Sequence, residues 1–540
     1  MALRCLSLRY ETAEVGLVWL RDRNRFPDES VNLIYLDPPF NSNADYNVIF
    51  NEMTGEKSKA QLQAFDDTWE WEREASALAL NELASSLPDG AQFIEWLASR
   101  GDKTSKSMSA YLGMMAIRLL ELRRVLHHNG SIYLHCDSTA SHYLKILMDT
   151  IFSPRSFRNE IIWKRVFAHS DPKKYGRVHD TLLFYTKGQQ WTWNKIYGDY
   201  DPEYIRKYYR YNDAETGEKF LSRSLTAPGG RGPRYEWKGI VRNWRVTREN
   251  MEKLEQDKMI YYTRTGIPRF KQFRKDMKGP PLQTIWTDIL PVVTWTAEGL
   301  GFETQKPVAL LRRIIEASSN VGEVVLDPFC GCGSTLIAAS DPEIDRRWIG
   351  IDITHLAINL IEQRLKDNYG QEIKSTYIVE GNPFDVTSAQ ALWDKNTKEF
   401  ELWALSLVEG ARPRQQDRGV DGILGFVDEG RKVETIVVQV KGGEKLSPYI
   451  MRDLIGTVEN EKAAMGLLIT LHPLTSGMME YAVHQKPYTS TLWERAYPRI
   501  QVRTIKELLV DHKEFELPPR ISLLKKAAPA KEQGQSPKLL

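Results

Sequence analysis

Four consecutive residues near the N-terminus, Asp37-Pro38-Pro39-Phe40, combine groups that could activate an aromatic amine. Such an amine is a poor nucleophile because its lone pair is delocalised into the ring. A carboxylate and a backbone carbonyl that accept its two hydrogens would favour the pyramidal form and direct the lone pair outward. The prolines fix the turn and bring no competing N–H donors, and Phe40 could stack on the ring. Alone, the tetrapeptide is also compatible with a plain turn that ends a strand.

A second segment, at 327–335, has the composition of a loop that holds a nucleoside-like ligand. It reads Asp-Pro-Phe-Cys-Gly-Cys-Gly-Ser-Thr, between a predicted strand at 323–326 and a predicted helix at 335–339. Glycines at such a turn let a ligand approach the backbone N–H groups. Asp352 ends the next predicted strand, where a carboxylate can hold ribose hydroxyls. The loop lacks the Lys-Ser/Thr pair of a phosphate-binding loop, and we interpret Cys330 and Cys332 as its small buried residues.

The elements that must position these segments alternate between strand and helix. The aliphatic run that begins at residue 30 stops at Pro38-Pro39, as expected of a buried parallel strand that ends in a loop. Further strands are predicted at 131–135, 160–163, 181–185, 323–326 and 347–351, the first after a turn at Asn129-Gly130, with helices at 107–126, 141–152 and 307–318. This order predicts a doubly wound α/β sheet.

The alternation is interrupted at about 191–285 by a basic, aromatic segment. It holds 20 Lys and Arg against 12 Asp and Glu, whereas the rest of the chain is slightly acidic. The aromatic residues interleaved with these charges include Tyr204, Tyr208, Tyr209, Tyr211, Trp237, Trp244, Tyr261 and Tyr262. Such a surface suits phosphates and stacked bases, but this feature alone fits a domain with an aromatic core equally well.

The whole chain has 540 residues, which predicts more than one domain. With 42% hydrophobic and 27% charged residues and no long apolar run, we expect a cytoplasmic protein with no membrane partner. Four cysteines cannot build a disulfide framework, and no paired C-x-x-C motif suggests zinc. A net charge of +2 identifies no partner by itself.

Together the two motifs resemble those of the DNA amino-methyltransferases that modify adenine N6 or cytosine N4. The resemblance covers roughly 14–390, and the catalytic motif precedes the cofactor motif, as in type III modification subunits. The matching segments are 37–40 with its continuation 41–46, Thr304-Gln305-Lys306-Pro307 with Leu310 and Leu311, the loop 327–335, and the strand 347–352.

The resemblance implies transfer of a methyl group from S-adenosylmethionine to an exocyclic amine of double-stranded DNA, adenine being more typical than cytosine for this motif form. Asp37 and the Pro38 carbonyl would polarise the amine, with Pro39 fixing the turn and Phe40 stacking on the flipped base. The implied cofactor-binding residues are Thr304, Lys306, Asp327, Pro328, Phe329, Gly331, Gly333, Thr335 and Asp352. One departure stands out: the family's Gly-Asp pair before the catalytic strand is missing from 14–20, where Glu14 is the candidate substitute.

The resemblance also divides the chain. It implies a catalytic half at 1–190, a target-recognition region at 191–285 and a cofactor-binding half at 286–395. The tail at 525–540, rich in Lys, Ala, Pro and Gln, is expected to be disordered.

A composition change near 395 marks a second, smaller α/β region. We predict a helix from Glu399 and then a hairpin that turns at 428–430 and carries Gln439 and Lys441 two apart on one strand face. With Asp421 on the paired strand, these residues resemble the core of Mrr-like restriction endonucleases, over 399–510, with Gln where Glu is common. In that family the acid holds Mg²⁺ and the lysine orients a water, so Asp421 is the candidate metal ligand. An active nuclease, a DNA-binding form without activity and an unrelated fold all remain open.

Three rivals to the methyltransferase reading stay open at this point. They are a single-chain restriction–modification enzyme whose main activity is cleavage, an RNA methyltransferase and an inactive DNA-binding module. The motif order argues against the RNA enzyme. A homodimer and a separate restriction subunit are both open as partners.

Overall fold

The computed structural model describes residues 3–7, 17, 20–38, 73–166, 173–292, 298–300, 305–352, 355–383, 385–408, 411–414, 419–428 and 433–521. Glu14, Pro39, Phe40, the segment 41–46, Thr304 and the tail at 525–540 lie outside these ranges. The chain divides into two compact units, one of them Lys195–Gln283 and the other the remainder.

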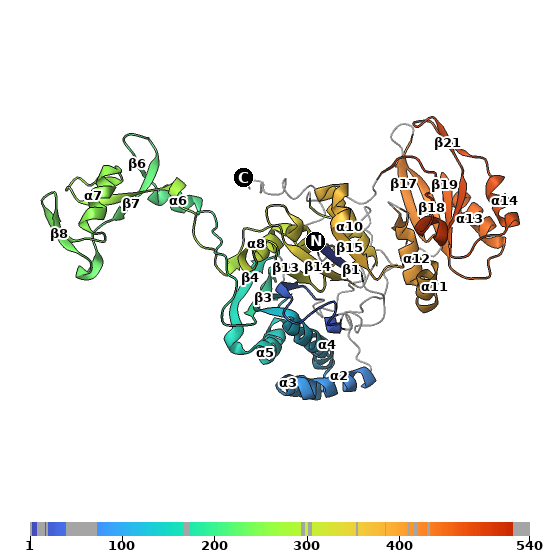
Figure 1. Ribbon diagram of the computed structural model, residues 1–540, viewed down its shortest axis with the longest axis horizontal. Coiled ribbons are helices and arrows are strands. Elements are labelled where there is room, and N and C mark those ends of the chain that lie inside the picture. Colours follow the sequence, from blue (N-terminus) through green and yellow to red (C-terminus); the bar gives the residue numbers. More distant parts are fainter. Residues whose placement is uncertain are drawn as a thin grey trace. The chain divides into compact units, whose positions relative to one another are not determined.

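The larger unit is built on a mixed central sheet, nine-stranded in the described part of the chain (Figure 1). Its strands, in spatial order, are β12 (Ile285–Trp286), β4 (Phe157–Lys164), β5 (His179–Thr186), β3 (Leu126–Cys136), β2 (Val31–Leu36), β13 (Val324–Asp327), β14 (Arg347–Asp352), β1 (Leu3–Ser7) and β15 (Tyr377–Glu380). Neighbours are parallel except at β5, which is antiparallel to β4 and β3. The carboxyl ends of β2, β13 and β14 therefore meet at one edge, where both motif loops begin.

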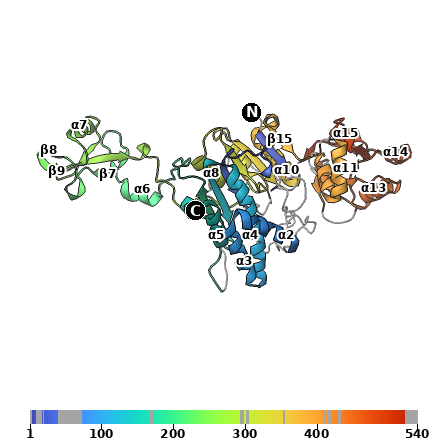
Figure 2. The ribbon, with the colours of Figure 1, turned by 60° about the horizontal axis from the view of Figure 1, so that its bottom comes forward.

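Helices cover both faces of this sheet, which confirms the predicted doubly wound architecture. One face packs against α2 (Arg73–Ser86), α3 (Pro88–Ser99), α4 (Lys103–Val125) and α5 (Ser141–Phe152), which gather on one side in Figures 1 and 2. The other face packs against α8 (Val308–Ser318), α9 (Ser334–Ser340) and α10 (His355–Tyr369). Strand β2 serves both cores, since Ile34 and Leu36 face the first layer and Leu33 and Tyr35 the second.

The predicted turn at Asn129-Gly130 is wrong. β3 runs continuously from Leu126 to Cys136, and the irregularity is a bulge within it: Val31 of β2 faces Leu126, whereas Leu33 faces Ser131. A Cβ at Gly130 would lie 2.8 Å from the Asn32 carbonyl oxygen, so glycine is needed where the bulge approaches β2.

The helix predicted at 107–126 begins earlier, at Lys103. Asp102 caps it, because the Asp102 side chain accepts a hydrogen bond from the Ser105 N–H at 2.9 Å.

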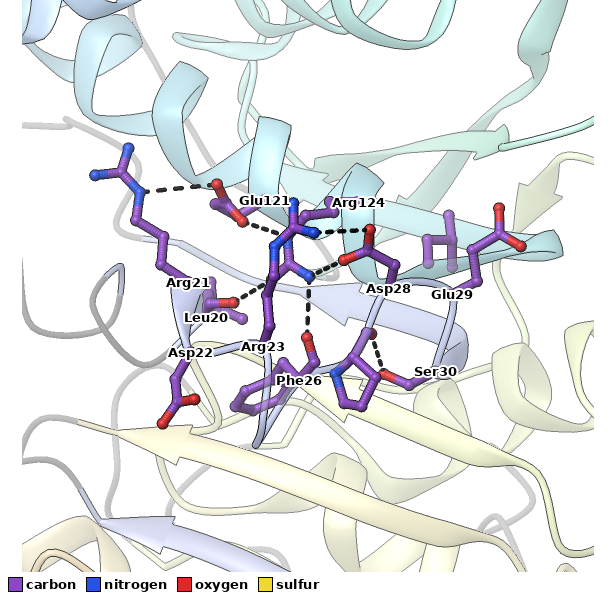
Figure 3. A network of polar contacts seen from close by, with 12 residues as sticks. Leu20, Arg21, Asp22, Arg23, Phe26, Asp28, Glu29, Ser30, Glu121 and Arg124 are labelled. Carbon is purple, nitrogen blue, oxygen red and sulfur yellow. Dashed lines mark hydrogen bonds and ion pairs between the residues drawn. The ribbon is translucent and has the colours of Figure 1, made fainter.

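A polar network ties the segment before β2 to the last turn of α4 (Figure 3). The Arg124 guanidinium donates to the backbone carbonyls of Leu20 and Phe26 and pairs with Asp28 and Glu121. It thereby fixes the point at which the chain enters β2, the strand that Asp37 directly follows.

The unit Lys195–Gln283 has its own small core. A four-stranded antiparallel sheet, in the order β10-β11-β7-β6, lies with the hairpin of β8 and β9 and two helices. The bounds are α6 (Pro202–Tyr208), β6 (Tyr211–Asn212), β7 (Lys219–Ser224), β8 (Arg234–Trp237), β9 (Ile240–Asn243), α7 (Arg248–Gln256), β10 (Ile260–Tyr262) and β11 (Pro268–Phe273). Tyr209, Trp237 and Trp244 are buried, so these three of the noted aromatics are structural and cannot stack on bases.

The two ends of this unit run side by side and form a paired neck, 196–198 with 280–282. The Gly198 N–H donates to the Pro280 carbonyl at 2.9 Å, and the Leu282 N–H donates to the Ile196 carbonyl at 3.0 Å. A Cβ at Gly279 would lie 2.0 Å from the Gly198 carbonyl oxygen, so this crossing requires glycine.

The C-terminal region has a second sheet, in the order β16-β17-β18-β19-β22 with β23 beside β17. Its strands are β16 (Arg412–Pro413), β17 (Gly422–Val427), β18 (Val433–Lys441), β19 (Met465–Thr470), β22 (Ile500–Thr504) and β23 (Arg520–Ile521), with a small hairpin of β20 (Tyr488–Ser490) and β21 (Arg495–Tyr497). The helices are α11 (Val386–Lys395), α12 (Thr397–Ser406), α13 (Tyr449–Asn460), α14 (Ser476–Val483) and α15 (Ile505–Leu509). The predicted helix and hairpin correspond to α12 and to antiparallel β17 and β18.

Among the helices that the structure describes, none combines the length and apolar character needed to cross a membrane.

Candidate active site

Asp37 directly follows β2, beside the carboxyl end of β13, and its two oxygens have different surroundings. Oδ2 forms an ion pair with Lys306, just before α8. Oδ1 is buried and has no hydrogen-bond partner among the described residues. A buried acceptor without a donor is costly, so Oδ1 is the atom of Asp37 suited to accept a hydrogen from a substrate.

The loop after β13 folds around two carboxylates. Asp327 is almost fully buried and accepts hydrogen bonds from the Thr335 hydroxyl and from the Phe329 N–H, the latter at 3.1 Å. Burial raises the pKa of Asp327 to about 7, and the nearby charges of Asp37 and Asp352 act in the same direction. The Gly331 N–H donates to Asp352 Oδ2 at 2.9 Å, which joins the loop to the end of β14.

The two glycines of this loop have different tasks. Both have positive φ, 48° at Gly331 and 78° at Gly333, a region that favours glycine. A Cβ at Gly333 would lie 2.6 Å from Ile361 of α10, so Gly333 permits close packing of α9 and α10. Gly331 instead lines the pocket described below. Cys330 and Cys332 are buried, as predicted.

A pocket lies where β2, β13, the loop and the starts of α8 and α9 meet. Its lining residues are Tyr35, Asp37, Lys306, Leu311, Asp327, Phe329, Cys330, Gly331, Cys332, Ser334 and Thr335. The structure thus brings together six of the predicted site residues: Asp37, Lys306, Asp327, Phe329, Gly331 and Thr335. Pro38, Pro328, Gly333 and Asp352 are described but do not line it.

Two features of the pocket escaped the sequence reasoning. Lys306 was assigned to the cofactor motif, yet it pairs with Asp37 of the other motif. Tyr35 was not singled out, although it lies two residues before Asp37 on β2 and therefore on the same face. The strand period could have identified Tyr35; the Lys306 pairing needed the tertiary structure.

In the C-terminal region, Asp421 and Lys441 lie at adjacent ends of β17 and β18. Asp421 Oδ2 accepts from the Val440 N–H at 2.7 Å, and the Lys441 Nζ is 4.0 Å from the same oxygen. The predicted hairpin therefore does bring the acid and the lysine together.

Gln439 is fully buried, and its partners determine its orientation. Its Nε2 donates to the Gly419 carbonyl and to Asp453 Oδ2 of α13. Both partners only accept hydrogen bonds, so the amide nitrogen must face them. The other amide atom, Oε1, is buried and has no partner among the described residues.

Two further acids belong to this site, Asp453 and Glu401 of α12. Burial raises the pKa of Glu401, as does the charge of Asp421, while Lys398 and Lys441 lower it. Among the described residues no group of three or more His, Cys, Asp or Glu side chains could hold a metal ion.

Comparison with protein-family models gives one match to the N-terminal and central part of the chain: the DNA methylase family matches residues 31–363 of the 540. The chain belongs to the DNA methylase family. The matched range contains the two motif loops, the pocket and the unit Lys195–Gln283.

A second family model, described as restriction endonuclease, matches residues 396–496, which include Asp421, Gln439, Lys441 and Asp453. This match confirms the predicted fusion of a DNA methylase with an Mrr-like endonuclease region and removes the unrelated fold from the three alternatives.

Relatives are of restriction–modification type. The chain is 33% identical over 263 residues to the type II methyltransferase M.EcaI of Enterobacter cloacae, covering 47% of this chain and 57% of the relative. It is 28% identical over 331 residues to the StyLTI Mod subunit, part of a type III restriction-modification enzyme of Salmonella typhimurium. This match covers 58% of this chain and 46% of the relative. The chain thus spans about half the length of the curated relatives it matches.

Solved structures give a weaker likeness. The PvuII DNA methyltransferase, described as cytosine-N4-specific, matches 69% of this chain and 94% of its own at 11% identity, with a TM-score of 0.31. The fold assignment rests on the sheet and the family match rather than on this likeness.

Proposed function

We propose that this chain transfers the methyl group of S-adenosylmethionine to the exocyclic amine of adenine in a specific sequence of double-stranded DNA. The observation that carries the proposal is the buried Asp37 Oδ1, which has no donor among the described residues while Oδ2 is held by Lys306. Cytosine is the alternative base, since both amines offer two hydrogens to an acceptor.

The chemistry follows from what these groups can accept and hold. Lys306 fixes the orientation of the Asp37 carboxylate, so that Oδ1 accepts one amine hydrogen of a base turned out of the duplex. The Pro38 carbonyl is the expected acceptor for the second hydrogen. Both contacts favour the pyramidal amine, whose lone pair would attack the methyl carbon in line as the S–C bond of the sulfonium breaks. The thioether would leave, and the surplus amine proton would pass to Asp37 Oδ1.

The pocket fits S-adenosylmethionine, which would supply a methyl group already activated by a sulfonium. Gly331 allows close approach of the backbone, Phe329 offers an apolar surface, and Asp327 and Asp352 provide carboxylates near the loop. We assign these four residues to the cofactor, with Thr335 supporting Asp327 through its hydroxyl. Thr304, Pro39 and Phe40, which lie outside the described residues, keep their roles as expectations from the family.

Sequence recognition is assigned to the unit Lys195–Gln283. Tyr204 and Tyr208 lie on α6 beside Arg206 and Lys207, and all four are at least partly exposed. They are candidates for contact with the DNA backbone and with exposed bases.

The test uses genomic DNA from a methylation-free bacterial host that expresses the full chain. Mass spectrometry of the nucleosides and modification-sensitive sequencing should show N6-methyladenine at one sequence motif. Asp37→Asn removes the acceptor charge at constant shape and should lower methylation by about 100-fold or more.

The matched control is Asp137→Asn. Asp137 follows β3 at the same sheet edge, but its carboxylate caps the N–H groups of Thr139 and Ala140 and does not line the pocket. This variant should methylate like the wild type. N4-methylcytosine instead of N6-methyladenine would correct the base, and an unmodified genome with soluble protein would refute the proposal.

A second candidate activity, Mg²⁺-dependent DNA cleavage, is favoured by the C-terminal geometry. Asp421 and the Gln439 amide oxygen would hold the ion, which keeps several of its waters, and Lys441 would orient a water. The outcome that supports it is cleavage that Asp421→Ala abolishes while methylation survives. Binding of DNA without cleavage at any Mg²⁺ concentration would assign the region to DNA binding alone.

A further inference from the structure

Three buried polar side chains form a hydrogen-bonded line behind the pocket, across β2, β3 and β5. The Tyr35 hydroxyl is 2.8 Å from His135 Nδ1, and His135 Nε2 is 3.1 Å from Asp180 Oδ2. Tyr35, His135 and Asp180 are 2%, 0% and 1% exposed. Polar groups are rarely kept at such depth without a task, and the proposed mechanism does not use this line.

The order of the line determines where its hydrogens lie. Burial raises the pKa of Asp180, but the hydrogen bond from His135 and the nearby Arg165 and Lys306 lower it overall, so Asp180 is ionised and only accepts. In the assignment proposed below, His135 is the neutral imidazole, with its hydrogen on Nε2 toward the Asp180 carboxylate and its acceptor at Nδ1. In that assignment the Tyr35 hydroxyl donates its only hydrogen to His135, and toward the pocket it can only accept.

The other hydroxyls of the pocket wall behave in the same way. Ser334 Oγ donates to the Lys306 carbonyl at 2.7 Å, and Thr335 Oγ1 donates to Asp327. Among the described lining residues, Tyr35, Ser334 and Thr335 thus direct their hydrogens into the protein. With the Asp37 carboxylate, they make a wall of acceptor oxygens.

We propose that Tyr35, held as an acceptor by His135 and Asp180, makes the pocket prefer a positively charged sulfonium ligand over the neutral thioether product. A sulfonium polarises the C–H groups bonded to it, and lone pairs facing them are attractive, whereas a thioether lacks that charge. This inference rests on the proposed function, because it assumes that the pocket receives the methyl donor. Asp180 and His135 are positioning residues in it.

The test compares dissociation constants for S-adenosylmethionine and S-adenosylhomocysteine, measured by calorimetry on the full chain. Tyr35→Phe removes the oxygen and should reduce the preference for the sulfonium by about three- to tenfold, with little change for the thioether. Asp180→Asn should do the same with Tyr35 intact, because an amide donor at His135 Nε2 moves the ring hydrogen to Nδ1 and turns the tyrosine hydrogen toward the pocket.

A double variant and a control make the test specific. In the Asp180→Asn background, Tyr35→Phe should lower the preference no further. Tyr133→Phe is the matched control. Tyr133 is a buried tyrosine of β3 whose hydroxyl lies 2.7 Å from Ser318 Oγ, and it does not line the pocket. The ratio of the two dissociation constants should therefore stay at the wild-type value in this variant.

The outcomes separate the two proposals. A wild-type chain that binds neither ligand refutes the proposed function. Wild-type binding with unchanged ratios in Tyr35→Phe and Asp180→Asn overturns the role of Tyr35 and leaves the proposed function standing. An equal loss of preference in Tyr133→Phe also overturns it, because the effect would then come from a loosened core.

Discussion

At the residue scale, Asp327 is a carboxyl group placed where a negative charge is costly. Its pKa of about 7 means that the folded chain holds a proton that the unfolded chain releases near pH 4. The folded state therefore binds more protons between about pH 4 and about pH 7, and this group's contribution to the free energy of unfolding falls as the pH rises through that window. The carboxyl of Glu399, whose pKa burial raises to about 7, acts in the same direction.

The prediction is made relative to Asp327→Asn, which keeps the shape of the side chain and removes its titration. Thermal unfolding of the two proteins between about pH 5 and about pH 8 should show the wild type losing stability relative to the variant as the pH rises. A difference that does not change with pH would mean that Asp327 titrates in its ordinary range.

Gln439 gives a second prediction at this scale. The Gly419 carbonyl and Asp453 both require a donor at the Gln439 amide nitrogen, so Gln439→Glu should destabilise the C-terminal region by about 1–3 kcal/mol. Adding Asp453→Asn supplies a donor and should recover much of that loss. Thermal unfolding decides the point, and a stable Gln439→Glu variant would contradict the orientation assigned to the amide.

Much of the candidate site could be predicted from local sequence, but its connections could not. Asp37, Asp327 and Gly331 belong to short motifs whose spacing reflects strand ends and a glycine turn, and the structure places them around one pocket. The Lys306–Asp37 pair joins residues 269 positions apart, and the line from Tyr35 to Asp180 crosses three strands. Such contacts depend on the strand order, which a single sequence does not encode locally.

At the element scale, Arg124 is the residue that anchors the entry to β2. Arg124→Met removes hydrogen bonds to two backbone carbonyls and ion pairs to two acids at a side chain only 15% exposed, and should lower the free energy of unfolding by about 1–3 kcal/mol. The control is Arg23→Met, because Arg23 also pairs with Asp28, at 3.5 Å, but is 72% exposed; its loss should cost less than about 0.5 kcal/mol. Equal effects in urea unfolding would show that the network of Figure 3 contributes only surface charge.

Most helices and strands could be predicted from hydrophobic runs and periodicity. The predictions were wrong where tertiary contacts determine the local structure. The Asn129-Gly130 pair favours a turn locally, yet pairing with β2 on both sides of the bulge keeps β3 continuous. The strands β1 and β15 were not predicted; β1 pairs with β14 and β15 pairs with β1, which defines that edge of the sheet.

At the scale of the whole molecule, the unit Lys195–Gln283 is separable because its ends are paired with each other. Replacing 199–279 by a short Gly-Ser linker should leave the methylase fold and S-adenosylmethionine binding intact, since Gly198 and Pro280 are already hydrogen-bonded neighbours. Sequence-specific methylation should be lost. Calorimetry checks the binding of S-adenosylmethionine, and nucleoside analysis checks the loss of methylation. Retained methylation at the same motif would show that other residues of the chain recognise the DNA sequence.

The paired neck also affects how genes of this family can recombine. Two chains of this family that share such a joint can exchange everything beyond it through a pair of recombination events, and neither the pocket nor its supporting strands would change. On the proposed recognition role of this unit, a new DNA target would then arise from a single exchange of an intact folded part.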